Sequence, residues 1–255
     1  NTSPPTAFVT GSSRGIGLGI AEALAKQGFN LVIHGRTRSA DLNRAQQKLL
    51  LHGVSVEALA FDIADVTEHA DALAFISEKY GNIDCLVNNA GVSVHNRADL
   101  LDVSLASFDE QIAVNLRGPF FLTQAVSGLM TNTLSDHFRS IITISSSNAE
   151  AVAVERGEYC LAKSALSMMT KLFAVRLAAD HINTYDVMPG LIETDMTAGA
   201  KVKYDKLINK GFSPINRWGK PADIGSVVAA LAVGNMSFMT GESLHVDGGL
   251  LISRY

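Results

Sequence analysis

Short apolar runs alternate with longer amphipathic stretches along the whole chain. The short runs are rich in β-branched residues and predict strands at 7–11, 30–36, 54–62, 85–91, 140–146, 182–190 and 242–249. The stretches between them predict helices at 17–28, 39–52, 66–80, 104–130, 158–180 and 221–234. Strands that are apolar along nearly their whole length indicate a parallel sheet covered by helices on both faces. The predicted fold class is therefore α/β, a doubly wound parallel sheet of about seven strands.

One segment of the chain lacks a clear periodic pattern. No linker, repeat or low-complexity stretch divides the sequence, so residues 1–255 are predicted to form a single domain. Residues 191–220 follow the sixth predicted strand. Because open α/β sheets bind ligands at the carboxyl ends of their strands, we expect this segment to form a substrate lid.

Composition and charge exclude several classes of protein. Of the 255 residues, 47% are hydrophobic and 18% are charged, which is typical of a well-packed globular enzyme. The net charge of −4 argues against a nucleic-acid partner, and no apolar run has the length of a membrane span. The amino-terminal residues lack the pattern of a signal peptide, and Cys85 and Cys160 are too few for a disulfide framework. We expect a cytoplasmic protein in which both cysteines pack as small buried residues.

Residues 10–20, TGSSRGIGLGI, place a cluster of glycines between the first predicted strand and the first predicted helix. Gly11, Gly15 and Gly17 allow a sharp turn and a close approach to a pyrophosphate, while the helix N-terminus offers unpaired N–H groups. Their spacing, G-x3-G-x-G, differs from the common G-x-G-x-x-G fingerprint. A tight turn whose glycines serve only packing would have a similar sequence, but the flanking strand and helix favour a dinucleotide-binding site.

The end of the second predicted strand indicates which nicotinamide cofactor would bind. A site for NAD usually has a carboxylate about 20 residues after the glycines. Here the chain reads HGRTR, so Arg36 follows Gly35, and a guanidinium can bind a 2′-phosphate through charge-assisted hydrogen bonds. Arg14 in the turn supplies a second positive charge, and Arg38 a third. Solvated surface arginines would look the same, but two of them at the expected places favour NADP(H) over NAD(H).

Five motifs follow one another at the spacings of a known family and cover nearly the whole chain. They are TGSSRGIG, FDIAD at 61–65, NNAG at 88–91, YCLAK at 159–163 and PGLIETDM at 189–196. With them the chain resembles the short-chain dehydrogenases/reductases. The resemblance implies a Rossmann-type fold and an NADP-dependent enzyme that transfers hydride between its cofactor and a carbonyl or alcohol group.

The resemblance also implies a catalytic set. VNLRGPF contains Asn115 at the position of the family's helix asparagine, and YCLAK contributes Tyr159 and Lys163. Ser146 stands thirteen residues before Tyr159, which is the family's usual distance, although its neighbours 145 and 147 are also serines that compete for the role. Taken one at a time, these residues would more often be a helix contact, a cap or a local hydrogen bond. Their combination favours catalysis.

The cofactor-binding residues that the resemblance implies come from six segments of the chain. In the family, Asp62 would bond the adenine amino group with Ile63 beside it, and the backbone of Ile192 and the hydroxyl of Thr194 would hold the nicotinamide amide. The full expected set is Gly11, Ser13, Arg14, Gly15, Ile16, Gly17, Arg36, Asp62, Ile63, Asn89, Ala90, Gly91, Tyr159, Lys163, Pro189, Gly190, Ile192 and Thr194.

Tyr159 and Lys163 are one helical turn apart, so both side chains leave the same face of the helix. Reduction of a ketone needs a proton on oxygen, and a tyrosine with its ordinary pKa of about 10 is a weak acid at neutral pH. A nearby ammonium favours the phenolate, so we expect Lys163 to lower the pKa of Tyr159. Ser146 can hydrogen-bond the substrate oxygen, and Asn115 resembles the residue that holds a water between Lys163 and solvent.

The remaining polar residues give weaker signals. The histidines show no ligand spacing and have no cysteine partner, so we expect no metal site; those considered are His34, His95, His137 and His181. Asp247 in HVDGG is expected to fix the turn after the last strand.

Within the family, PGLIETDMT and RWGKPADI look most like bacterial 3-oxoacyl-[acyl-carrier-protein] reductases. We therefore expect NADPH-dependent reduction of the keto group of a 3-oxoacyl thioester, as in fatty-acid biosynthesis. An acidic acyl carrier protein could be steered by basic residues near the expected lid, although a solvated helix face would also explain them. These residues are Lys201, Lys203, Lys206 and Lys210.

Two other functions stay open. Glu155, Arg156 and Glu158 depart from the small or neutral residues usual before the tyrosine of carrier-protein reductases, and they either face water or line the substrate entrance. A reductase or dehydrogenase of sugars, polyols or other small carbonyl compounds is therefore the alternative enzyme. A non-catalytic NADP-binding regulatory protein is the alternative of another class. In relatives, helices like those at 104–130 and 158–180 form a four-helix dimer interface and dimers pair, so a homotetramer is expected.

Overall fold

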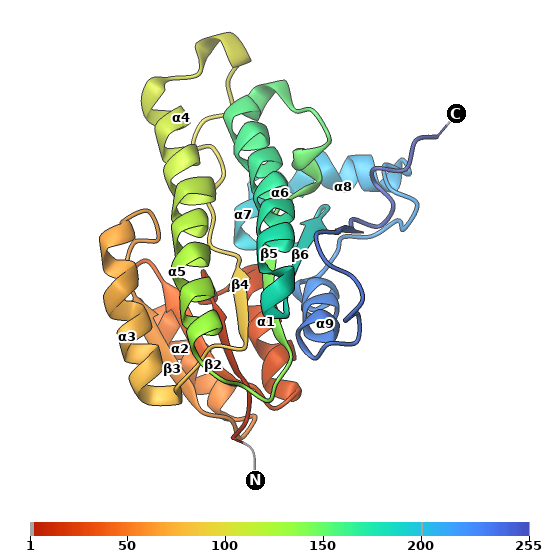
Figure 1. Ribbon diagram of the computed structural model, residues 1–255. Coiled ribbons are helices and arrows are strands. Elements are labelled where there is room, and N and C mark those ends of the chain that lie inside the picture. Colours follow the sequence, from red (N-terminus) through yellow and green to blue (C-terminus); the bar gives the residue numbers. More distant parts are fainter. Residues whose placement is uncertain (1–2, 200, 255) are drawn as a thin grey trace.

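Seven parallel strands form one sheet in the computed structural model, which describes residues 3–199 and 201–254 (Figure 1). The strands are β1 (Thr6–Val9), β2 (Asn30–Gly35), β3 (Val56–Ala60), β4 (Cys85–Asn88), β5 (Arg139–Ile144), β6 (Ile182–Pro189) and β7 (Ser243–Val246). Their order is β3-β2-β1-β4-β5-β6-β7. The predicted α/β class, the parallel sheet and its seven strands are confirmed.

Helices cover both faces of the sheet. They are α1 (Gly15–Lys26), α2 (Ala40–Leu50), α3 (His69–Tyr80), α4 (Leu105–Ile112), α5 (Gly118–Asn132), α6 (Gly157–Leu177), α7 (Asp195–Ala198), α8 (Lys201–Asn209) and α9 (Pro221–Ala232). Short 3-10 turns lie at Val66–Glu68, Leu100–Asp102, Ser147–Ala149, Val154–Arg156 and Ala178–Asp180. The strands read as continuously apolar because alternate side chains enter different cores. In β1, Ala7 and Val9 join one core with α1 and α9, whereas Phe8 joins the other with α3 and α5.

The helix predicted at 104–130 is three elements in the structure. A π-helical turn, Ala113–Arg117, separates α4 from α5. Pro119 lacks the N–H that an α-helix would donate to the carbonyl of Asn115, so the wider turn falls where regular helix cannot continue. The periodic pattern spanned the interruption because the chain stays helical on both sides.

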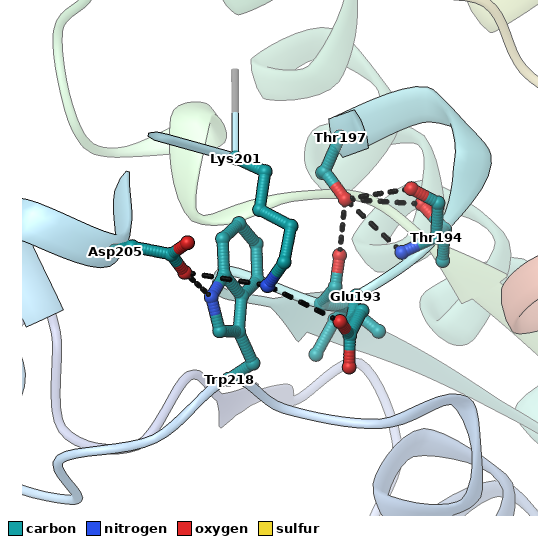
Figure 2. Close-up of polar contacts among 7 residues, drawn as sticks. Glu193, Thr194, Thr197, Lys201, Asp205 and Trp218 are labelled. Atoms are coloured by element: carbon teal, nitrogen blue, oxygen red, sulfur yellow. Dashed lines mark hydrogen bonds and ion pairs between the residues drawn. The ribbon is translucent and has the colours of Figure 1, made fainter. Parts of the chain in front are cut away.

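The segment 191–220, for which the sequence showed no clear pattern, contains α7 and α8. Tyr204 and Ile208 are the buried residues of α8, one turn apart, and most of its other residues are polar. Figure 2 shows how this segment is held: the Trp218 indole donates to Asp205 Oδ1 at 2.7 Å, and Lys201 Nζ lies 3.3 Å from both Asp205 and Glu193. Two such short helices have too few buried apolar positions for the sequence to reveal them.

Three smaller expectations concern single residues and the membrane. Cys85 is buried in β4, as predicted, but Cys160 is half-buried, so the prediction for Cys160 is right only in part. Asp247 accepts hydrogen bonds from the N–H groups of Gly249 and Leu251 at 2.8 and 2.9 Å, which confirms its place in the last turn. Among the described residues, no helix is long and apolar enough to cross a membrane.

Candidate active site

The sheet reverses its order at β1, because β2 and β3 lie on one side of it and β4 on the other. The carboxyl ends of β1 and β4 therefore bound the crevice in which doubly wound folds bind nucleotides. The two ends are joined by Asn89, whose side-chain amide donates to the carbonyls of Thr10 and Gly11 at 2.8 and 2.9 Å. Gly11 also lies against Ala90, since a Cβ on Gly11 would approach Ala90 Cα to 2.7 Å.

The glycine turn fits an anionic group of a dinucleotide. Gly11 and Gly15 have φ of +63° and +56°, a backbone region that favours glycine. A Cβ on Gly17 would overlap the carbonyl oxygen of Gly11 and the amide nitrogen of Asn89. Arg14 begins α1 without a side-chain capping bond, so the first N–H groups of the helix remain available for an anion. Together these features match the pyrophosphate-binding role that the sequence predicted for the turn.

A buried histidine supports this turn, and the sequence analysis missed it. His34 Nδ1 accepts from the Gly11 N–H at 3.1 Å, and the opposite ring nitrogen, Nε2, contacts the Phe61 carbonyl oxygen at 2.9 Å. This pairing requires the neutral tautomer with its proton on Nε2. Burial lowers the pKa of His34 to about 4. The available signal was a histidine inside an apolar strand, but His34 was considered only as a metal ligand.

We expect the stability of the fold to fall below pH 6.5 because of His34. Its folded-state pKa lies below its unfolded value, so the unfolded chain binds the extra proton and stability is lost as the pH falls from about 6.5 towards about 4. The expected loss between pH 6.5 and pH 5 is about 2 kcal/mol. Urea unfolding at both pH values should show a clearly smaller difference for His34→Gln, whose amide can bond the same two groups. An equal pH dependence in wild type and variant would contradict this assignment.

The three arginines expected near the cofactor differ in their surroundings. Arg14 Nη1 lies 3.8 Å from Asp41 and 3.7 Å from Asp195, at an exposed position. Arg36 is exposed, and no carboxylate of the described chain pairs with it. Arg38 donates to the carbonyl of Ala58 in β3, so its guanidinium is engaged with the sheet edge. Arg14 and Arg36 thus remain at the crevice, whereas the third predicted charge is committed elsewhere.

The outer cofactor segments are also brought to the crevice. Asp62 Oδ1 accepts from the Ala64 N–H at 2.9 Å, and Ile63 is buried beside it. The segment after β6 lies against the glycine turn, because a Cβ on Gly15 would reach Thr194 Cγ2 at 3.5 Å. That segment is fixed by Thr197, whose hydroxyl donates to the Ile192 carbonyl at 2.8 Å (Figure 2).

The predicted cofactor residues lie on consecutive loops at this edge of the sheet. Ser13 and Ile16 are half-buried within the glycine turn, and Gly91 follows β4. Pro189 ends β6, and Gly190 packs on Asp247 so closely that a Cβ would lie 2.6 Å from its Cα. A hollow of about 890 Å³ between α1 and α9 shares Arg14, Gly15 and Thr194 with this region but contains none of the predicted catalytic residues. It therefore adjoins the predicted cofactor residues without reaching the predicted catalytic ones.

The predicted catalytic side chains come from three elements. Ser146 follows β5, while Tyr159 and Lys163 lie on α6, and the Lys163 Nζ atom is 5.8 Å from the centre of the Tyr159 ring. Ser146 hydrogen-bonds the Tyr159 side chain, whereas Ser145 is buried with its hydroxyl 3.4 Å from the Val187 carbonyl. Of the consecutive serines, Ser146 is the one that faces the tyrosine.

Asn115 lies in the π-helical turn and is fully buried. Its Oδ1 accepts from the Val92 N–H at 3.0 Å, and its Nδ2 donates to the Val92 carbonyl at 2.9 Å and to Gln111 Oε1 at 2.6 Å. Gly91 separates it from the lysine, since a Cβ there would lie 2.7 Å from Asn115 Oδ1 and 3.6 Å from Lys163 Nζ. The asparagine therefore ties the end of β4 to the helix beside Lys163, the predicted catalytic lysine.

The electrostatics of the pair differ from the expectation. Burial raises the pKa of Tyr159, and the hydrogen bond from Ser146 and the charge of Arg156 only partly oppose this. Burial also lowers the pKa of Lys163 to about 8, while its ammonium donates to the Ile144 carbonyl at 3.0 Å. The prediction that Lys163 lowers the pKa of Tyr159 below its ordinary value is therefore wrong for the protein alone, because desolvation dominates and the cation that opposes it is Arg156. The phenol is protonated at neutral pH and can serve as a proton donor.

A second buried group near Lys163 was missed. Asp186 on β6 is fully buried, its Oδ2 accepts from the Ser243 hydroxyl at 3.0 Å, and its Oδ1 has no partner among the described residues. Its charge raises the pKa of Lys163 against the effect of burial. The apolar pattern of 182–190 predicts a strand and gives no sign of a role for Asp186.

Metal chemistry has no visible site here: among the residues that the structure describes, no group of three His, Cys, Asp or Glu side chains could hold an ion. The histidines are used otherwise, for example His137, which contacts the Ser3 carbonyl at 2.7 Å.

A crevice at the switch point of a doubly wound sheet, with a tyrosine and a lysine beside it, defines a dinucleotide-dependent oxidoreductase. A family model described as enoyl-(acyl carrier protein) reductase matches residues 11–251. The chain accordingly belongs to the short-chain dehydrogenase/reductase family, whose members bind a nicotinamide cofactor.

The proteins to which this chain is similar are named for different substrates. A crystal structure of a 3-oxoacyl-[acyl-carrier protein] reductase from Brucella melitensis in complex with NAD is 41% identical, covers 100% of both chains and has a TM-score of 0.97. The 3-oxoacyl-[acyl-carrier-protein] reductase of Aquifex aeolicus is 33% identical over 95% of this chain and 96% of its own. The gluconate 5-dehydrogenase of Gluconobacter oxydans is 31% identical over 97% and 94%.

Proposed function

We propose that the protein reduces a ketone to a secondary alcohol with NADPH, and that Tyr159 donates the proton. The observation that carries this is the position of Tyr159, which is hydrogen-bonded to Ser146 and lies one turn from Lys163 beside the glycine-turn crevice. A bound nicotinamide would supply the hydride. Ser146 then holds the substrate oxygen as negative charge develops there, and the phenol delivers the proton to it. Lys163 would bind and orient the cofactor ribose. Asn115 would hold the water through which Lys163 exchanges protons with solvent.

The preference for NADPH rests on two arginines. Arg36 is exposed and unpaired within the described chain, and Arg14 is balanced by Asp41 and Asp195 at distances above 3.5 Å. A 2′-phosphate can replace such long, solvated ion pairs with short charge-assisted bonds. Against this, a relative of known structure was crystallised in complex with NAD.

Replacement of Arg36 tests the cofactor proposal. We expect Arg36→Gln to lower kcat/KM for NADPH by roughly 10- to 100-fold, the loss of one charge-assisted bond, and to leave kcat/KM for NADH within about 2-fold. Steady-state rates with both cofactors measure this, and Arg254→Gln, far along the chain, is the matched control. Equal losses with both cofactors, or a wild type that prefers NADH, would remove the proposal.

Two substrate classes are in competition. The likeness to 3-oxoacyl-[acyl-carrier-protein] reductases supports a 3-oxoacyl thioester, the substrate expected from the sequence. The predicted basic patch for an acidic carrier protein carries less free positive charge than the sequence indicates. Lys201 pairs with Glu193 and Asp205, and Lys203 pairs with Glu155. Lys206 and Lys210 are exposed. The likeness to gluconate 5-dehydrogenase supports the alternative, a small hydroxy or keto compound of the sugar-acid type.

A substrate panel separates these classes. NADPH consumption is measured with acetoacetyl thioester, with keto sugar acids and with neutral ketones, and NADH is run in parallel. Turnover of at least one ketone supports the proposed function. Tight cofactor binding with no turnover of any carbonyl compound would favour a non-catalytic binding protein, which the intact residue set argues against.

We also propose that a second copy of the chain covers the outer face of α5 and α6, as in a homotetramer. The proposed location of the protein is the cytoplasm. Phe121, Met168 and Leu172 are exposed on this face and border an apolar hollow of about 340 Å³. Contiguous exposed apolar side chains of this kind mark interaction surfaces. Sedimentation as a monomer would remove this part of the proposal.

A further inference from the structure

The charged residues before Tyr159 do not all face water. Glu155 is shared by two cations: Arg97, which follows β4, and Lys203 of α8, whose Nζ lies 3.3 Å away. This cluster connects the lid to the loop after β4. The Glu155 carboxylate already pairs with two cations, so it is not available to pair with a third.

Arg156 is the third cation, and it points at the predicted proton donor. Its guanidinium carbon lies 5.6 Å from the centre of the Tyr159 ring, and its Nε is buried without a hydrogen-bond acceptor. No carboxylate in the described part of the chain pairs with it. Glu158, two residues on, is buried and accepts instead from the Ser107 hydroxyl at 2.7 Å.

A half-buried arginine without a partner is costly, because a buried donor that makes no bond loses its hydration without compensation. A buried arginine of this kind is expected where a bound ligand supplies the missing hydrogen-bond acceptor. Its fork of N–H groups matches a carboxylate in two parallel bonds. The place is also suited to a substrate, because a ketone that accepts a proton from Tyr159 must approach its hydroxyl, and the ring of this tyrosine lies 5.6 Å from the Arg156 guanidinium carbon.

We propose that Arg156 binds a carboxylate of the substrate, and that the protein acts on keto and hydroxy acids. This inference rests on the proposed function, because it uses Tyr159 to define where the ketone lies. It favours the second of the two substrate classes above, since the reacting end of a 3-oxoacyl thioester carries no charge. Glu155, which pairs with Arg97 and Lys203, lies next to Arg156 in the sequence.

Two simpler roles of Arg156 make a different prediction. The guanidinium could merely pack on the aromatic ring, or its charge could only favour the phenolate of Tyr159. Either role would affect every ketone alike. A carboxylate-binding role affects charged substrates and spares neutral ones.

The test compares acids with their methyl esters. The probes are 3-oxobutanoate, 4-oxopentanoate and 5-oxohexanoate, each with its methyl ester, so that the distance from ketone to carboxylate varies in steps. For wild type we expect the best acid to exceed its ester in kcat/KM by roughly 10- to 100-fold, the range given by charge-assisted hydrogen bonds. Arg156→Gln should remove this preference mainly through KM and leave the rates on the esters within about 3-fold. Arg176→Gln, at an exposed arginine near the other end of α6, is the matched control.

The outcomes separate the inference from the proposed function. A preference for acids that Arg156→Gln abolishes supports the carboxylate site. Equal loss on acids and esters, a shifted pH profile with unchanged acid preference, or a wild type that prefers esters would each overturn it while hydride transfer stands. If no probe is turned over, acetoacetyl thioester is assayed: its turnover overturns the carboxylate site alone, and inactivity on every compound overturns the proposed function with it.

Discussion

Tyr159→Phe is expected to reduce kcat for ketone reduction by about 10²- to 10⁴-fold, the usual contribution of a general acid. The substitution keeps the ring and its packing against Lys163 and Arg156 but removes the hydroxyl that Ser146 bonds. Because that hydroxyl is the protonated phenol beside the crevice, no other group takes its place. Steady-state rates and the dissociation constant of NADPH, by fluorescence titration, are measured on the same preparations, and binding should change by less than about 3-fold.

Tyr185→Phe is the matched control. Tyr185 is a buried tyrosine of β6 whose hydroxyl donates to the Met236 carbonyl at 3.0 Å, away from the crevice. Its loss should cost about 1 kcal/mol of unfolding free energy and leave kcat unchanged. Similar kcat values for wild type and Tyr159→Phe would rule out Tyr159 as the proton donor, whatever the control shows.

Gly17→Ala is expected to weaken NADPH binding by about 10- to 100-fold and to lower the unfolding free energy by about 1–3 kcal/mol. The added methyl group would overlap the Gly11 carbonyl oxygen and the Asn89 amide, which are the atoms that lock the turn to β4. The turn must shift, and with it the N–H groups that face the pyrophosphate. Isothermal titration and urea unfolding measure the two effects.

Gly128→Ala provides the comparison, because Gly128 is an exposed helical residue of α5 with open space around its Cβ position. It should bind NADPH as wild type does, because the added methyl group meets no atom of the described chain. If Gly17→Ala also binds NADPH normally, the glycine turn does not approach the cofactor as described.

The fold could be predicted because its signals are local and repeated. A strand such as β1 buries Ala7 and Phe8 on opposite faces, so its apolar run reveals a sheet with both sides covered. The π-helical turn was not predicted, because it depends on one missing N–H, at Pro119, and not on periodicity. Helix α8 was missed for a related reason: only Tyr204 and Ile208 bury themselves in it.

The candidate site could be predicted where motif spacing fixes it. The motifs located the glycine turn, Ser146, Tyr159 and Lys163, and the structure brings these together at one edge of the sheet. Contacts between distant segments were beyond the sequence. His34 on β2 contacts Gly11 at the end of the neighbouring strand β1, and the balance of burial against charge at Tyr159 depends on how deeply α6 is packed.

Hydride transfer itself can be measured most directly with NADPH deuterated at C4 of the nicotinamide ring. The enzyme is incubated with this cofactor and the best ketone of the panel, and the alcohol is analysed by mass spectrometry. The account predicts an alcohol that carries one deuterium on the former carbonyl carbon, formed by wild type and almost absent with Tyr159→Phe. Two results would contradict this prediction. One is an alcohol without deuterium on that carbon although both hydrogens at C4 of the cofactor were replaced by deuterium, and the other is an equal amount of product from Tyr159→Phe.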